Sequence, residues 1–148
     1  MTPVEDPARA PLLLLDTHAL VWSINDGPRL GKTVKESIRL AGDEERVLVS
    51  AITPWEIALL VSKGRLTLGV DVMDWVRGAL AVPGVRLVPL EPEIAVASTR
   101  LAFDMHADPA DRILVATARH LGAALVTADQ ELLEIAKNGH FKAMDAGS

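Results

Sequence analysis

The sequence has 148 residues, which fits a single domain large enough to bury its own core. Hydrophobic residues make up 49% of it and no cysteine occurs, so disorder is disfavoured and both disulfides and thiolate metal sites are excluded. The net charge of −5 argues against a simple nucleic-acid-binding protein, unless part of the acidic charge is gathered to hold cations.

The N-terminal residues give no signal for a membrane anchor or for export. The longest early apolar run covers residues 12–15, far short of the roughly 20 residues that a membrane-spanning helix needs. Residues 1–10 contain two acids and lack the basic start of a signal peptide. We therefore predict a flexible N-terminal arm over 1–11, one domain over 12–148 and a cytoplasmic protein.

Short apolar runs alternate with longer helical patterns along the chain. Strands are predicted at 12–15, 47–49, 85–90 and 124–127. Residues 138–148 form either a weak final strand or a frayed end. Helices are predicted at 18–24, 32–41, 53–63, 71–81, 92–103, 109–121 and 130–137. Because the strands are apolar throughout and alternate with helices, we predict a three-layer α/β fold, whose mainly parallel sheet of four to five strands is covered on both faces.

Four acids occupy positions where such a fold binds ligands. Asp16 directly follows the first predicted strand, and Asp129 follows the strand at 124–127. Glu56 and Asp111 stand near the starts of two helices. Ligands of open α/β sheets bind outside the carboxyl ends of the strands, and helices that follow parallel strands begin at that same edge. The four carboxylates are therefore predicted to converge there.

Each acid also has an ordinary structural interpretation. Thr53 and Glu56 have the spacing of a capping box, with Thr53 as the N-cap and Glu56 at the third helical position. Asp108 and Asp111 repeat that spacing, and an Asp after a strand is common in turns. Taken singly, these readings are the more common ones. Four acids at one predicted edge favour a different role.

The chemistry of Mg²⁺ explains such a set. Mg²⁺ prefers hard oxygen ligands in near-octahedral geometry, and clustered carboxylates repel one another unless cations lie between them. One or two bound ions activate a water and neutralise charge on a phosphodiester, so no nucleophilic side chain is needed. The sequence indeed lacks a Gly-x-Ser-x-Gly elbow, a Gly-x-x-x-x-Gly-Lys loop and a Gly-x-Gly-x-x-Gly motif.

Four segments resemble a known family in order and in spacing. They cover residues 14–20, 50–58, 106–116 and 125–129. Together they resemble the PIN domain of VapC-type toxins from bacterial toxin–antitoxin pairs, over roughly residues 12 to 140. One position departs from the family pattern, because Ala110 stands where a bulky apolar residue, often Phe, is common. The departure is expected to alter packing and leaves the neighbouring acid in place.

The resemblance implies a function and a set of site residues. The family's metal-binding acids correspond to Asp16, Glu56, Asp111 and Asp129, with Thr127 as a nearby hydroxyl. Members are endoribonucleases that depend on Mg²⁺ or Mn²⁺, and their known targets include transfer RNA and ribosomal RNA. They commonly form homodimers, and a cognate VapB antitoxin occupies the active-site groove. A PIN domain over 12–148 with these partners is the expectation for this chain.

Several neighbouring residues are candidates for a supporting role. Thr17 follows the first acid. Lys63 and Arg65 end the helix that carries Glu56, where they favour contact with RNA phosphates. Arg112 either contacts RNA or makes a structural ion pair.

Two further residue types in this sequence favour structural roles. His106 is interpreted as a loop residue and not as a metal ligand. Trp22, Trp55 and Trp75 either stack on bases or pack in the core or at a dimer interface, and packing is favoured because each lies in an apolar helical pattern.

Two alternative functions differ in class from a ribonuclease. A phosphatase of the haloacid-dehalogenase type needs Asp-x-Asp after the first strand, whereas this chain has Asp16-Thr17-His18. A non-catalytic module would bind its antitoxin and act only in transcriptional autoregulation. A toxin stops growth when expressed alone, and the variant Asp16→Asn relieves that arrest, so expression distinguishes this module from an enzyme.

Overall fold

A computed structural model describes residues 9–148 of the chain; residues 1–8, on which most of the predicted N-terminal arm falls, lie outside the described residues. Five parallel strands form one sheet in the order β3-β2-β1-β4-β5. They are β1 (Leu13–Leu15), β2 (Val47–Ser50), β3 (Val85–Val88), β4 (Ala124–Thr127) and β5 (Lys142–Asp145). The predicted α/β class is confirmed, and the C-terminal residues form a strand rather than a frayed end.

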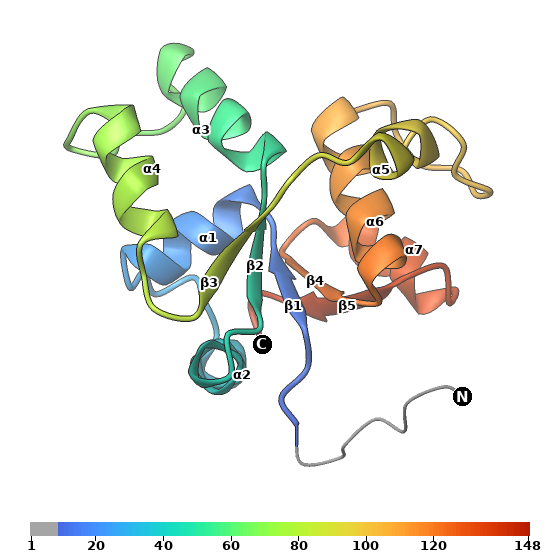
Figure 1. The fold of residues 1–148 in the computed structure, drawn as a ribbon, viewed down its shortest axis with the longest axis horizontal. Coiled ribbons are helices and arrows are strands. Elements are labelled where there is room, and N and C mark those ends of the chain that lie inside the picture. The colour runs from blue at the N-terminus through green and yellow to red at the C-terminus, as the bar shows by residue number, and fades with distance from the viewer. Residues whose placement is uncertain (1–8) are drawn as a thin grey trace.

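Seven helices cover the two faces of the sheet among the described residues. They are α1 (Thr17–Ile24), α2 (Lys32–Asp43), α3 (Ile52–Ser62), α4 (Val72–Leu80), α5 (Pro92–Ala97), α6 (Pro109–Leu121) and α7 (Gln130–Lys137). Figure 1 shows α1 to α4 on one side of the sheet and α5 to α7 on the other, so the three-layer prediction is confirmed. No helix within residues 9–148 is both long and apolar enough to cross a membrane.

Alternating side chains of the strands build a separate core on each face. Leu13 and Leu15 point to the side of α1 to α4, where Ile57 of α3 is also buried. Leu14 points to the opposite side and packs with Leu114 of α6. Because both faces are buried, the strands are apolar throughout, as the sequence pattern predicts. Burying each such leucine contributes about 1.5–3 kcal/mol to the free energy of unfolding.

The order of the strands locates the place where a ligand binds in folds of this kind. The chain runs from β1 outward through β2 and β3, and then returns to the other side of β1 as β4. Folds that reverse direction in this way leave a crevice at the carboxyl ends of the two strands on either side of the reversal. Here these strands are β1 and β4, and the acids that follow them are Asp16 and Asp129.

Helix α5 is shorter than predicted. The apolar pattern indicates a helix to Phe103, but α5 ends at Ala97. The hydroxyls of Ser98 and Thr99 each donate to a carbonyl three residues earlier, at 2.7 Å. The Ser98 carbonyl in turn accepts from the Arg112 guanidinium at 3.3 Å. These side-chain bonds compete with the helical hydrogen bonds, and helix α5 stops there.

Candidate metal centre

The two acids that follow strands serve as N-caps of the next helices. The Asp16 carboxylate accepts from the Ala19 N–H at 2.8 Å, at the start of α1. The Asp129 carboxylate accepts from the Leu132 N–H at 3.1 Å, at the start of α7. Each bond uses one carboxylate oxygen. Both acids are therefore fixed at the sheet edge by the backbone, and Asp129 keeps a second oxygen for a ligand.

The Thr127 hydroxyl connects these two acids at the end of β4. It accepts from the Asp129 N–H at 3.1 Å, and it donates a hydrogen bond to the Asp16 carboxyl. Thr127 is fully buried. Its predicted place near the acids is therefore matched by two hydrogen bonds, and it holds Asp16 and Asp129 in a fixed relation to each other.

Glu56 does not belong to a capping box, contrary to the sequence prediction. Helix α3 begins at Ile52, whose N–H donates to the Ser50 hydroxyl at 3.1 Å, and no side chain caps the helix. Thr53 is the second residue of the helix and is fully buried. Glu56 is consequently the fifth helical residue and not the third. Its carboxylate makes no hydrogen bond within residues 9–148, so it remains available to a ligand.

The start of helix α6 follows the sequence prediction more closely. The Asp108 carboxylate caps it by accepting from the Asp111 N–H at 3.1 Å. One Asp111 oxygen lies 3.3 Å from Nε2 of His106. The same His106 atom lies 3.9 Å from a carboxylate oxygen of Glu131. His106, which the sequence suggests is only a loop residue, thus contacts the acids directly.

One pocket of about 480 Å³ contains all four predicted acids. Five carboxylates line it: Asp16, Glu56, Asp108, Asp111 and Asp129. The remaining lining residues are Thr17, His18, Trp22, Arg29, Leu60 and Ala128. The predicted convergence at the carboxyl edge of the sheet is therefore seen in the structure.

Within the pocket, Asp111 is the acid shared by two groups of ligand atoms. Oxygens of Glu56, Asp108 and Asp111 lie within 4.8 Å of one another. The same spacing joins His106, Asp111 and Asp129. Asp16 lies outside both groups although it lines the same pocket. The geometry thus offers two neighbouring places for a cation, with Asp111 between them.

Burial and mutual repulsion alter the acidity of two of these carboxyls. Burial raises the pKa of Asp111 to about 7, and the charges of Asp108, Glu56 and Asp129 act in the same direction, whereas His106 opposes them. Burial also raises the pKa of Asp16, although hydrogen bonds from Thr127 and Ala19 partly lower it. Both shifts have causes that a bound cation removes or offsets.

The donor chemistry of the pocket fits a hard divalent cation such as Mg²⁺. All its acidic ligands are carboxylates, and no thiolate exists in the chain. Thr17 lines the same pocket and is only 2% exposed. Its hydroxyl has no hydrogen-bond partner among the described residues. A buried hydroxyl of this kind suits a water of the hydration shell that Mg²⁺ usually retains.

Three predicted auxiliary residues lie away from the pocket. Arg112 donates to the carbonyls of Ser98, Met105 and His106, at 3.2 to 3.3 Å. It therefore holds the segment before α6 in place, and within residues 9–148 it makes no ion pair. Lys63 and Arg65 are exposed at the end of α3 and do not line the pocket.

The three tryptophans have three different environments. Trp75 is buried, and its indole N–H lies 3.4 Å from the Asn25 side-chain oxygen. Trp55 is 53% exposed, so core packing is wrong for this residue. Trp22 is half-buried and lines the acidic pocket.

Among the pocket residues that the sequence does not predict as site residues are two charged ones, Asp108 and Arg29. Asp108 was interpreted only as a cap, and its His-x-Asp spacing with His106 was the one available signal. Arg29 lies in the loop between α1 and α2, where no periodicity or motif marks it. Its presence in the pocket depends on how that loop folds back, which only the structure shows.

The fold is a three-layer α/β domain with an acid-lined pocket at the carboxyl edge of its sheet, and the PIN domain family model matches residues 13–138. The chain belongs to the PIN domain family. Its sequence is 32% identical, over 120 residues, to Ribonuclease VapC22 of Mycobacterium tuberculosis (strain ATCC 25618 / H37Rv). That match covers 81% of this chain and 88% of the relative. The predicted family resemblance is confirmed.

Solved structures share the fold at lower sequence identity. VapBC2 from Rickettsia felis, bound to a DNA fragment from its promoter, has a TM-score of 0.64 at 15% identity, covering 89% of this chain and 96% of that one. DNA-bound VapBC from Salmonella typhimurium has a TM-score of 0.64 at 18% identity, covering 91% and 98%. FitAcB from Neisseria gonorrhoeae has a TM-score of 0.61 at 20% sequence identity, and the match covers 90% of this chain and 97% of that one. These matches support the fold.

Proposed function

We propose that this chain is a Mg²⁺-dependent endoribonuclease toxin that cleaves structured RNA, either transfer RNA or ribosomal RNA, and that a cognate VapB-like antitoxin neutralises it. The observation that carries the proposal is the single pocket lined by Asp16, Glu56, Asp111 and Asp129. The similarity to Ribonuclease VapC22 supports the same reaction. Mn²⁺ has the same ligand preferences as Mg²⁺ and is an alternative ion.

The residues divide the work of such a site among them. Asp16, Asp111 and Asp129 are the principal ligands, and Glu56 either binds through water or acts as a base. Bound Mg²⁺ supplies the orientation and deprotonation of the attacking water and neutralises charge on the phosphodiester. Thr127 positions Asp16 and Asp129, and Thr17 holds a water at the pocket wall. Lys63 and Arg65 remain proposed contacts to more distant RNA phosphates, and Arg112 supports the start of α6.

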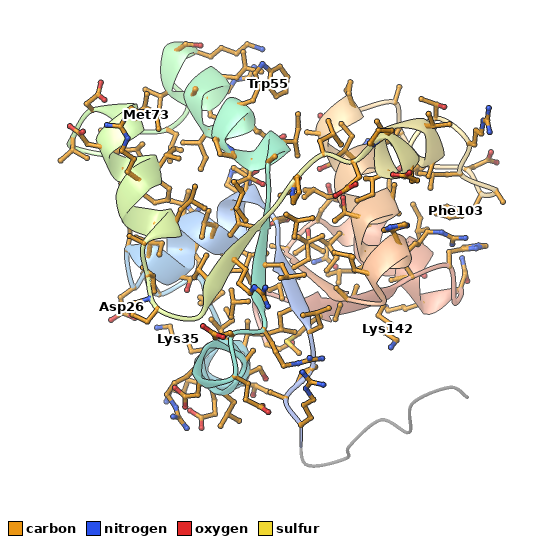
Figure 2. The ribbon with its side chains drawn as sticks, in the orientation of Figure 1. Asp26, Lys35, Trp55, Met73, Phe103 and Lys142 are labelled. Atoms are coloured by element: carbon orange, nitrogen blue, oxygen red, sulfur yellow. The ribbon has the colours of Figure 1, made fainter. Side chains whose placement is uncertain are left out.

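The protein partners are proposed on separate grounds. Several of the solved relatives are VapBC or FitAB complexes. Trp55 and Met73, on α3 and α4, are 53% and 46% exposed, and Figure 2 shows both on the outside of these helices. Large apolar side chains in such positions favour a protein contact, either with the antitoxin or in a homodimer. The cytoplasmic location stays a prediction.

The decisive experiment compares purified native protein with the variants Asp16→Asn and Asp43→Asn. We expect native protein to cleave transfer or ribosomal RNA with Mg²⁺ and to stop when a chelator is added. Asp16→Asn keeps the oxygen that caps α1 but loses the charge, so cleavage falls at least roughly a hundredfold, about 2.7 kcal/mol in activation free energy. Asp43 is an exposed acid on α2, paired with Arg39, and its variant retains full activity.

The same variants separate the enzyme from a non-catalytic module. Expressed without an antitoxin, the native chain and Asp43→Asn stop growth, whereas Asp16→Asn does not. Mapping of new RNA ends after induction then identifies the cleaved RNA. Chelator-insensitive cleavage, or equal growth arrest by all three proteins, would contradict the proposed function.

A further inference from the structure

The loop between α1 and α2, residues 25–31, brings a positive charge to the acid-lined pocket. Arg29 is one of the pocket's lining residues and the one lining residue with a permanent positive charge. It shares the pocket with five carboxylates, yet within residues 9–148 it forms no ion pair and no side-chain hydrogen bond. All five of its N–H donors therefore remain available to a ligand.

The first half of this loop is fixed to helix α1 and to helix α4. The Gly27 N–H donates to the Trp22 carbonyl at 2.9 Å, which closes the loop against the end of α1. The Asn25 side-chain oxygen accepts from the Trp75 indole N–H at 3.4 Å. These two bonds join the loop to both helices before Arg29 is reached.

The second half of the loop is fixed to helix α2 and to the C-terminal segment. Lys35 and Asp26 form an ion pair at 3.4 Å, and Figure 2 shows these two side chains beside each other. The Gly31 N–H donates to the Ala146 carbonyl at 2.9 Å. Leu30 is 4% exposed in the core. The residue directly after Arg29 is thus an anchor, and the backbone of Arg29 is held in place.

The Arg29 side chain rests on an aromatic ring of the same pocket. Its guanidinium carbon lies 5.8 Å from the centre of the Trp22 ring. An arginine that rests on a tryptophan ring loses less freedom when it binds a ligand, because part of its conformation is already set. Because Arg29 makes no hydrogen bond within residues 9–148, its donors stay free for a planar or tetrahedral anion.

We propose that Arg29 binds a backbone phosphate of the RNA next to the phosphate that is cleaved. This proposal rests on the proposed ribonuclease function. The scissile phosphate is drawn to the carboxylate side through the bound cations, and the neighbouring phosphate is repelled by the same carboxylates unless a cation faces it. The guanidinium of Arg29 can bind two phosphate oxygens at once, and its positive charge offsets the repulsion from the carboxylates.

Binding of a labelled RNA oligonucleotide at several salt concentrations tests this role. The measurement uses the full chain carrying Asp16→Asn, with Mg²⁺, so that cleavage is slow. Adding Arg29→Gln is expected to weaken binding about tenfold and to reduce the slope of log affinity against log salt by about 0.7, the contribution of one phosphate on a single strand. Arg29→Lys keeps the charge, so it restores the slope but not the full affinity.

Arg86→Gln is the matched control. Arg86 is an exposed arginine on β3 that does not line the pocket, so its loss leaves affinity and slope unchanged. Arg29 is itself exposed, so its variants are expected to keep the native thermal unfolding curve. Unchanged affinity and slope in Arg29→Gln, or an equal change in Arg86→Gln, would overturn the proposal.

Cleavage by protein without the Asp16→Asn change keeps the two proposals separate. If this protein cleaves RNA and Arg29→Gln shows the native KM, the Arg29 proposal is wrong and the ribonuclease stands. If it cleaves no RNA while Arg29→Gln still lowers the salt slope, the ribonuclease is wrong and phosphate binding by Arg29 stands.

Discussion

The two strand-end acids and the two helix-borne acids of the pocket differ in what else they do. Asp16 and Asp129 each accept a backbone N–H at the start of a helix, at 2.8 and 3.1 Å. Glu56 and Asp111 accept no backbone hydrogen bond within the described residues, and Asp111 instead faces other acids. The first pair therefore contributes to folding as well as to the site. Glu56 and Asp111 are held at the site by helices whose N-termini are not capped by these two carboxylates.

This difference separates stability from activity. Removing the charge of a helix-borne acid relieves repulsion in the folded protein, whereas truncating a strand-end acid leaves a helix N-terminus without its cap. Both changes are expected to abolish cleavage. Only the second is expected to lower the free energy of unfolding.

The largest effect is expected for Asp111→Asn. RNA cleavage falls at least roughly a hundredfold, because both groups of ligand atoms share Asp111. The pKa of Asp111 is raised from 3.8 to about 7, so the native free energy of unfolding falls as pH rises between these values. Asparagine cannot ionise and avoids this loss. At pH 8 the free energy of unfolding of the variant is therefore expected to exceed the native value by up to about 4 kcal/mol, because one pKa unit corresponds to about 1.4 kcal/mol.

Chemical unfolding at pH 4 and at pH 8, each with and without Mg²⁺, measures this prediction. The advantage of Asp111→Asn nearly disappears at pH 4, where the carboxyl is protonated in the folded state and about half protonated in the unfolded state, whose pKa is 3.8. Mg²⁺ stabilises native protein more at pH 8 than at pH 4, since it competes with protons for the same oxygens. A variant less stable than native protein at pH 8 would show that Asp111 has a structural role after all.

A smaller effect is expected at the strand-end acid Asp129. Asp129→Ala removes the cap of α7 and lowers the free energy of unfolding by about 1 kcal/mol. Asp129→Asn keeps an oxygen for the Leu132 N–H and stays close to native stability. Both variants lose cleavage. Urea unfolding without metal is the measurement, and equal stability of the two variants would remove the distinction between strand-end and helix-borne acids.

The sequence predicted the placement of the acids better than their local roles. A strand followed by Asp, or an Asp before Pro at a helix start, is local information, and Asp16, Asp108 and Asp129 were placed from it. The alternation of strands and helices predicts a parallel sheet. The pairing of β1 with β2 and β4, which brings these ends together, is seen only in the structure.

The features that were missed depend on contacts between distant residues. Arg29 enters the pocket because its loop is fixed by residues as far away as Ala146. Helix α5 stops early partly because Arg112, fourteen residues further on, takes the Ser98 carbonyl. His106 approaches Asp111 only through the shape of the segment between α5 and α6. No periodicity in the sequence records such contacts.

The smallest expected effect comes from Thr53→Val, and it tests why Glu56 is free. If Thr53 capped α3, as the capping-box spacing predicts, its loss would lower the free energy of unfolding by about 1 kcal/mol. In the structure the buried Thr53 hydroxyl has no partner among residues 9–148, and the Ser50 hydroxyl bonds the first helical N–H instead. Valine has nearly the same shape and no orphaned polar atom, so stability is expected to stay within about 0.5 kcal/mol of native or to rise.

Ser50→Ala, which removes the observed bond to Ile52, is the matched variant and is expected to be the less stable of the two in urea unfolding. The reverse order would restore the capping box and return Glu56 to a structural role.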